Sequence, residues 1–95
     1  MAAPKEYLHQ EFDLLPGDVV EVNLAGNAAN VMLLDPTNFE AYWQGRTFHY
    51  YGGYARTSPF RITPPRPGRW HLVVDLGGGA GSVQASGSVI SGAVS

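Results

Sequence analysis

The sequence predicts a small all-β protein, a jelly-roll-like antiparallel β-sandwich with about seven or eight short strands. Apolar and polar residues alternate over short segments, which is typical of strands that bury one face. Glycine and proline recur between these segments, at a spacing of about eight to twelve residues that sandwiches share. The chain has 95 residues, which is enough for one domain.

The N-terminal half contains three predicted strands. Residues 7–14 and 19–24 alternate between apolar and polar side chains. Between them, Pro16 and Gly17 supply turn chemistry, since proline fixes φ and glycine allows a positive φ. We therefore expect the first two strands to form a β-hairpin. A third strand, apolar throughout, is expected at residues 31–34.

One short helix is expected at residues 36–44. Asp35 is a good N-cap, and Pro36 suits the first helical position. Gly45 stands where such a helix would end. The sequence places this helix at one end or edge of the sandwich, where it would not form a layer of its own.

The C-terminal half alternates strands with connectors rich in glycine and proline. Residues 64–68 include three prolines, which exclude both helix and central strand. The glycine-rich segment 77–81 precedes an alternating strand instead of a helix, so a hairpin turn is favoured over a phosphate-binding loop. Strands are expected at residues 47–51, 60–63, 69–76 and 82–90.

Composition and charge narrow the possible classes of partner. The formal net charge of −2 argues against a general nucleic-acid-binding protein. Five of the six cationic residues lie between Arg46 and Arg69, where solvated surface arginines are favoured over a basic patch. The chain has no cysteine and no signal-peptide or membrane-span pattern, so we expect a cytoplasmic domain over 7–90 with terminal extensions at 1–6 and 91–95.

The titratable residues do not form a catalytic or metal-binding motif. His9, His49 and His71 could meet Glu11 or Asp75, but the chain contains no HxH or HExxH spacing. His71 and Asp75 share a strand face but lie about 13 Å apart along it. No Gly-x-Ser-x-Gly elbow occurs. We therefore expect surface or cross-strand histidines, with no catalytic residue, bound metal or cofactor.

The densest functional signal is the segment 42–56, with six aromatic residues and two arginines. Alternation in a strand sends some of these outward, and tyrosine and arginine are enriched in binding surfaces. A core position remains open for the tyrosines, while Phe39, Trp43 and Trp70 are expected in the core. The candidate partner- or ligand-binding residues are Tyr42, Arg46, His49, Tyr50, Tyr51, Tyr54 and Arg56.

Several motifs occur in an order that resembles a known family. They are LHQEF at 8–12, GDVVEV at 17–22, NVMLLD at 30–35 and GRWHLVVDLGG at 68–78. In this order the chain resembles the bacterial DUF1883 family over residues 7–90. The resemblance implies a small β-sandwich. It also implies similarity to modules that occur alone or joined to TIR domains, and hence an accessory role in bacterial defence or signalling. It brings no catalytic residues.

The function favoured by these observations is a non-catalytic protein-interaction or self-assembly module. Open sandwiches keep edge strands that can pair with a neighbour, and small domains often gain stability by oligomerising. The alternative is a domain that binds a small carbohydrate or nucleotide through the aromatic and arginine residues of 42–56. We expect a protein partner or a second copy of the chain, with no role for nucleic acid or membrane.

Overall fold

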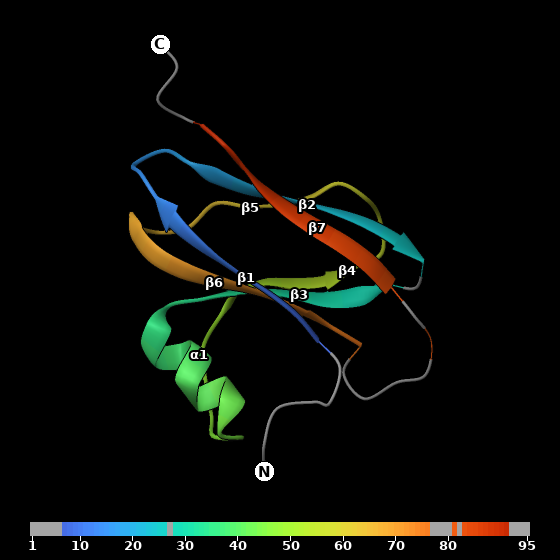
Figure 1. Ribbon diagram of the computed structural model, residues 1–95, viewed down its shortest axis with the longest axis horizontal. Helices are drawn as coiled ribbons and strands as arrows, with labels where there is room; N and C mark the ends of the chain where they lie inside the picture. The colour runs from blue at the N-terminus through green and yellow to red at the C-terminus, as the bar shows by residue number, and fades with distance from the viewer. Residues whose placement is uncertain (1–6, 27, 77–80, 82, 92–95) are drawn as a thin grey trace.

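Two antiparallel sheets pack face to face in the computed structural model, which describes residues 7–26, 28–76, 81 and 83–91 (Figure 1). This arrangement confirms the predicted all-β sandwich with one short helix. Most strand boundaries also agree with the sequence pattern to within one or two residues. The elements are β1 (Tyr7–Leu14), β2 (Val19–Gly26), β3 (Ala29–Leu34), α1 (Pro36–Trp43), β4 (Tyr51–Ala55), β5 (Phe60–Ile62), β6 (Gly68–Asp75) and β7 (Val83–Ile90).

The order of the strands shows that most strands that follow one another in sequence lie in different sheets, with β3 and β4 as the exception. One sheet has four strands in the order β1-β6-β3-β4, and the other has three in the order β5-β2-β7. The predicted hairpin of β1 and β2 is therefore wrong. The turn between them, closed by an Asp18 N–H bond to the Leu15 carbonyl at 3.0 Å, carries the chain from one sheet to the other.

The predicted hairpin between the last two strands is wrong for the same reason. Strand β6 lies in the four-stranded sheet and pairs with β1 and β3, whereas β7 lies at the edge of the other sheet and pairs with β2. Alternation identified both strands, but it contains no information about their partners. Residues 77–80 of the predicted turn lie outside the described residues.

The main core fills the space between the two sheets. Trp70 is its largest member, and the indole N–H of this side chain donates to the Arg66 carbonyl at 3.1 Å. The predicted inward faces of β2 and β6 are confirmed, because their alternate residues are buried together. The buried cluster consists of Leu14, Val20, Val22, Ala29, Val31, Leu33, Ala55, Ile62, Trp70, Leu72 and Val74.

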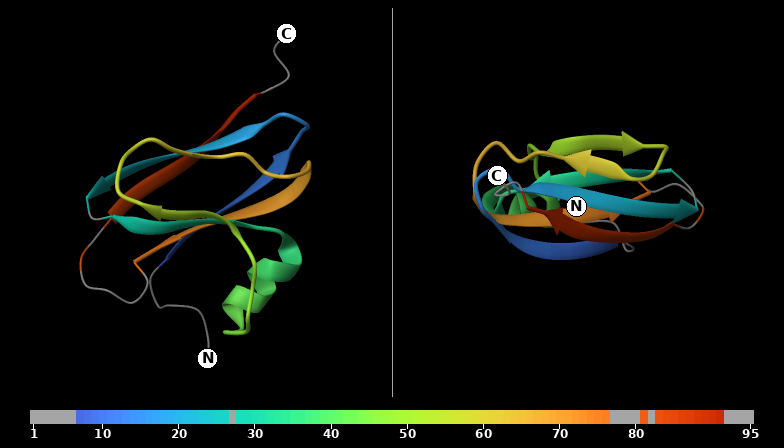
Figure 2. Two further views of the ribbon diagram at one scale, coloured as in Figure 1. Left: turned by 180° about the vertical axis from the view of Figure 1, so that it is seen from behind. Right: turned by 90° about the horizontal axis from the view of Figure 1, so that it is seen from above.

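Helix α1 lies on part of the outer face of the four-stranded sheet, against β3 and β6 (Figures 1 and 2). Its predicted N-cap is confirmed, since Oδ1 of Asp35 accepts from the Asn38 N–H at 2.8 Å. Because the helix lies on this face, it forms a second apolar cluster with Met32, Leu34 and Val73. Within the described residues, no helix is long and apolar enough to cross a membrane.

The predicted strand at residues 47–51 is wrong, because the edge strand β4 begins only at Tyr51. Residues 46–50 instead run back beside α1, where the backbone N–H of His49 donates to the Asn38 side chain at 2.8 Å. Pairing with β3 begins where glycine permits a close approach. A Cβ at Gly52, which has φ +134°, would lie 2.1 Å from the Val31 carbonyl oxygen.

The aromatic side chains expected in the core divide between buried and exposed positions. Trp70 is buried, and Phe39 is half-buried against the cluster under α1. Trp43 is 51% exposed, so its predicted core position is wrong. It stands at the last residue of α1, and its ring lies edge-on to Tyr7 with the centroids 6.1 Å apart.

Candidate functional site

Tyr42, the first of the seven predicted binding residues, is buried under α1, which corrects the expectation that it lies on an exposed surface. Its hydroxyl donates to Oδ2 of Asp75 at 2.7 Å. Oδ1 of the same carboxylate accepts from the Asn30 side-chain amide at 3.0 Å. Burial and, next, the bond to Asp75 raise the pKa of Tyr42 far above its ordinary value. The phenol therefore stays protonated and acts as a buried donor.

Three further predicted residues are exposed along the segment that connects α1 to β4. The backbone N–H of Arg46 donates to the Ala41 carbonyl at 2.8 Å and closes the end of the helix. His49 is exposed there, and Tyr50 is 46% exposed with its ring 5.8 Å from that of Phe48. These side chains are therefore accessible to solvent.

Of the last three predicted residues, Tyr51 and Tyr54 lie on opposite faces of the edge strand β4, and Arg56 directly follows the strand. Tyr51 shares a face with the buried Ala55, and its ring lies edge-on to Trp70 at 5.8 Å. Tyr54 points to the opposite face, where the Arg56 guanidinium carbon lies 5.7 Å from the centre of its ring. The structure thus brings Tyr54 and Arg56 together but separates them from Tyr51.

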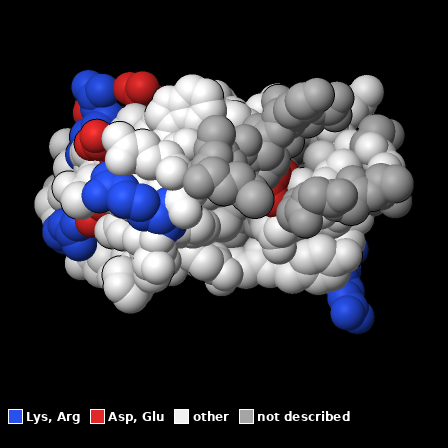
Figure 3. Space-filling view, turned by 90° about the horizontal axis from the view of Figure 1, so that it is seen from below, with Lys and Arg blue, Asp and Glu red and all other residues white. Residues whose placement is uncertain are grey.

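Three of the five cationic residues from Arg46 to Arg69 form ion pairs with acidic neighbours. Arg61 pairs with Glu21, and Arg66 pairs with Asp35, each at 2.9 Å. Arg69 pairs with two carboxylates of β1. Figure 3 shows basic and acidic side chains side by side at one end of the molecule. This mixture supports solvated surface arginines over a basic patch.

The outer face of the four-stranded sheet brings two histidines together. The register of β1 and β6 places Glu11 opposite His71, which makes His9 the diagonal neighbour of His71. Nε2 of His9 lies 2.8 Å from Nδ1 of His71. Oε1 of Glu11 lies 3.9 Å from the same Nδ1. One ligand-type atom from each of the three residues lies within 4.8 Å of the other two. We call these residues the His9–Glu11–His71 cluster.

Phe39 of α1 holds both imidazoles from one side. The centre of its ring lies 4.3 Å from each histidine ring, with interplanar angles of 14° to His9 and 3° to His71. The two imidazoles are themselves nearly parallel, at 16°. The helix therefore restricts the orientation of both histidines.

Arg69 orients the carboxylate of the cluster. Its Nη1 donates to Oε2 of Glu11, and its Nε donates to Oδ1 of Asp13, both at 2.8 Å. Because Oε2 is engaged in this way, the second oxygen of Glu11 faces His71. Arg69 thus holds Oε2 of Glu11 and leaves Oε1 of the same carboxylate facing the imidazoles.

The surroundings of His71 favour its neutral form. Burial lowers the pKa of His71 below its ordinary value of 6.5, and the neighbouring His9 lowers it further. Arg69 acts in the same direction, whereas Glu11 and Asp35 oppose it. A neutral imidazole has one nitrogen lone pair, which can accept a hydrogen bond or bind a metal ion.

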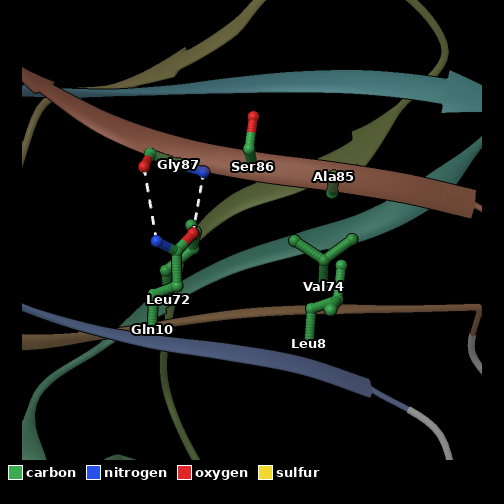
Figure 4. Close-up of a pocket in the computed structure, with 7 residues that line it drawn as sticks. All are labelled: Leu8, Gln10, Leu72, Val74, Ala85, Ser86 and Gly87. Atoms are coloured by element: carbon green, nitrogen blue, oxygen red, sulfur yellow. Dashed lines mark hydrogen bonds between the residues drawn. The ribbon is translucent and has the colours of Figure 1, made fainter.

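A second arrangement occurs on the side of the sandwich where the edge strands β1 and β7 face each other. Figure 4 shows the side chain of Gln10 reaching from β1 to the backbone of β7. The Gly87 N–H donates to Oε1 of Gln10 at 2.7 Å, and Nε2 of Gln10 donates to the Gly87 carbonyl at 3.4 Å. The amide thus makes the two bonds that a neighbouring strand would make.

The absence of a side chain at Gly87 permits this contact. A Cβ there would lie 2.5 Å from Cδ2 of Leu72 and 3.0 Å from Oε1 of Gln10. Beside the contact is a small apolar pocket, where Leu8 and Val74 lie below Ala85 and Leu72 lies next to Gln10 (Figure 4). The sandwich is therefore incompletely closed between β1 and β7.

Comparison with known proteins identifies the family. A model for a domain of unknown function, DUF1883, matches residues 5–92 of the 95-residue chain. The chain belongs to this family. The match confirms the resemblance drawn from the ordered motifs. Comparison of this DUF1883 domain with curated proteins and with solved structures gave no match.

The sequence of this DUF1883 domain allowed His9 and His71 to meet Glu11, but the missing ligand spacing disfavoured a metal site, and the contact of Gln10 with Gly87 was not expected. The sequence signal for the His9–Glu11–His71 cluster was the spacing of His9 and Glu11, which are two residues apart and so share a strand face. That His71 lies beside them depends on the pairing of β1 with β6, which are 54 residues apart between Leu14 and Gly68. The contact of Gln10 with Gly87 depends on the packing of one sheet on the other.

Proposed function

We propose that this DUF1883 domain is a non-catalytic self-assembly module in which β7 pairs with β7 of a second copy. The observation that carries the proposal is the nature of this edge strand. It has eight residues, with no charged residue and no proline. Natural edge strands are commonly protected by charge, proline or short length. The other edges follow this rule, since β1 bears Glu11 and Asp13, and β4 and β5 are short.

The direction of the backbone groups supports strand addition at β7. The N–H and carbonyl of Gly87 point away from β2, toward Gln10. The backbone N–H and carbonyl groups of successive residues in a strand point to alternate sides. Those of Ala85 and Val89 therefore point the same way as those of Gly87. An approaching strand would meet these groups. Val89 and Ile90 are also 39% and 41% exposed, which offers apolar area for contact.

A second copy suits this edge better than a charged partner would. The formal net charge is −2, but β7 has no charge, so two copies do not repel each other along this strand. Antiparallel pairing of two identical strands gives the two-fold symmetry that is commonest among homo-oligomers. Assembly of this kind would also suit an accessory role beside the TIR domains to which similar modules are joined.

Gln10 would compete with the second copy, since its amide occupies the ladder positions of Gly87. Its replacement should therefore strengthen self-association. We expect Gln10→Ala to lower the dissociation constant of the dimer by about tenfold, because two hydrogen bonds no longer need to be exchanged on pairing.

The test is sedimentation velocity over a concentration series. Wild-type chain should dimerise reversibly, and Val89→Lys should abolish the dimer by placing a charge on the edge. Asn23→Lys is the matched control, since it adds the same charge on the exposed face of β2, which lies in the middle of its sheet. A wild type and a Gln10→Ala variant that both stay monomeric at millimolar concentration would contradict the proposal.

A second candidate function, small-ligand binding, is favoured by the exposed pair of Tyr54 and Arg56. Tyr54 is 59% exposed, and its ring lies beside the Arg56 guanidinium group, an arrangement suited to a nucleobase or a sugar. Tyrosine fluorescence titrated with nucleotides and glycans tests it. Tyr54→Ala and Arg56→Ala should each weaken any binding, while Tyr50→Phe should not. Binding that is equal in all four proteins would exclude this site.

A further inference from the structure

We propose that the His9–Glu11–His71 cluster binds one divalent transition-metal ion, for which Zn²⁺ is the best chemical match. This site lies on the outer face of the four-stranded sheet and is separate from the β7 edge. The proposal therefore does not depend on self-assembly. Two imidazole nitrogens and one carboxylate oxygen are a donor set that Zn²⁺ accepts, with a fourth position left for water.

The distances suit a common ion. Zinc–nitrogen and zinc–oxygen bonds of about 2.0–2.2 Å place two ligands of a tetrahedral ion about 3.4 Å apart. The observed separations lie on both sides of this value, with 2.8 Å between the imidazole nitrogens and 3.9 Å between Nδ1 of His71 and Oε1 of Glu11. All three ligand atoms lie within 4.8 Å of one another. The 2.8 Å separation is that of a hydrogen bond between the two imidazoles, which a bound ion would replace.

The side chains around the cluster restrict the three ligands and leave Oε1 of Glu11 facing the histidines. Phe39 stacks on both imidazoles, which limits their rotation. Arg69 holds Oε2 of Glu11 and leaves Oε1 toward the histidines. Outer contacts of this kind to ligating carboxylates are common at metal sites.

The charges of the side chains around the cluster also favour a bound cation. Arg69 is paired with both Glu11 and Asp13, and Arg66 is paired with Asp35. Three carboxylates thus face two guanidinium groups around the cluster. His9 and Glu11 are exposed, so an ion can enter from solvent, whereas His71 is buried and its position is set by β6.

The test uses the full chain without a histidine tag, freed of metal with EDTA and titrated with ZnCl₂ by calorimetry. We expect saturation at one ion per chain and a higher melting temperature with Zn²⁺, since an ion bound to the folded state stabilises it. Co²⁺ should give the visible absorption of a tetrahedral site. No saturable binding of either ion would overturn the proposal.

Substitutions at the two exposed positions test the ligands without disturbing the core. His9→Gln and Glu11→Gln should each lower the affinity for Zn²⁺ by about 100-fold or more, because even outer contacts are worth about 10–100-fold. His49→Gln is the matched control and should bind like wild type, since His49 lies outside the cluster. Equal losses in all three variants, or no loss in His9→Gln and Glu11→Gln, would overturn the assignment.

A restoring substitution separates a ligand from a structural residue. Glu11→His supplies a nitrogen ligand at the same position, so it should recover most of the affinity lost in Glu11→Gln. Its Co²⁺ spectrum should also shift with the change from an oxygen to a nitrogen donor. If Glu11→His and Glu11→Gln bind Zn²⁺ equally, Glu11 is not a ligand and the proposed site is wrong.

Discussion

The four-stranded sheet is packed on its inner face and, where α1 lies over β3 and β6, on part of its outer face as well, whereas the three-stranded sheet is packed on its inner face. Helix α1 and the second apolar cluster lie on the outer face of the former, so residues 70–75 of β6 are all buried. In the latter, β7 alternates between half-buried and exposed residues. A polar side chain on the first sheet must therefore find a partner, while the second sheet leaves one face and a long edge to solvent.

This difference explains where the two candidate arrangements lie. The covered face gathers titratable side chains at fixed distances, as in the His9–Glu11–His71 cluster and the network of Tyr42 with Asp75. On the open sheet, the ion pair of Arg61 with Glu21 is exposed to solvent. The three-stranded sheet instead presents backbone N–H and carbonyl groups at its β7 edge.

The largest expected effect tests whether the covered face depends on its polar network. Asp75→Ala leaves the Tyr42 hydroxyl and the Asn30 amide without their shared acceptor. The loss of a partner by one buried and one half-buried group should lower the free energy of unfolding by about 3 kcal/mol, measured by urea denaturation. Ser88→Ala on the exposed face of β7 is the control and should change it by less than about 0.5 kcal/mol. Similar losses in both variants would remove the distinction between the faces.

The next effect concerns the open edge. Gly87→Ala forces a methyl group against Leu72, which is 2% exposed and cannot move freely. We expect a loss of about 1–2 kcal/mol in the free energy of unfolding. Gly53→Ala on β4 meets nothing within 4 Å and should be neutral or slightly stabilising. A Gly87→Ala variant as stable as Gly53→Ala would show that the contact of Gln10 with Gly87 is not tightly packed.

A smaller effect concerns the helix that covers the first sheet. Asp35→Ala removes the N-cap of α1 and should cost about 1 kcal/mol by thermal or urea unfolding. The lost ion pair with the exposed Arg66 should add little. Glu40→Ala in the middle of the helix is the control, since its side chain makes an exposed bond to Gln44. If both variants lose equal stability, the cap does not hold the helix on the sheet.

The smallest effect is a dependence of stability on pH. The pKa of His71 is lowered in the folded state, chiefly by burial, so near pH 6 the unfolded chain binds more protons. The contribution of His71 to the free energy of unfolding is therefore complete above the unfolded pKa of about 6.5 and is lost as the pH falls through the lower folded pKa. His71→Gln should flatten the curve between about pH 5 and 7, measured in EDTA. His49→Gln should keep it, and a wild-type curve no steeper than that of His71→Gln would contradict the assignment.

The sequence predicted the elements of this fold better than their arrangement. Alternation in β1, β2 and β6 is a property of a few neighbouring residues, and it identified each strand and its inward face. The cap of α1 was equally local, since it depends on Asp35 and the helix that follows it. The strand at residues 47–51 was misplaced because aromatic residues packed around the end of a helix show the same composition as a strand.

The candidate sites were less predictable because their residues meet across sheets and strands. Tyr42 and Tyr50 are tyrosines of the same aromatic segment, and the sequence does not distinguish them. The position of α1 decides that Tyr42 is buried and Tyr50 is exposed. Likewise, His9 and Glu11 share a face by their spacing, while His71 reaches them only because β6 pairs with β1.

By itself, then, the sequence determined the fold class, most strands, the capped helix and the membership of the DUF1883 family. These follow from periodicity, capping and ordered motifs, all of which operate along the chain. Tertiary structure alone decided that β1 and β2 lie in different sheets, that Gln10 reaches Gly87, and that two histidines meet under α1. The reason is physical, since strand pairing depends on how distant segments bury their apolar faces together, and no local pattern records the partner.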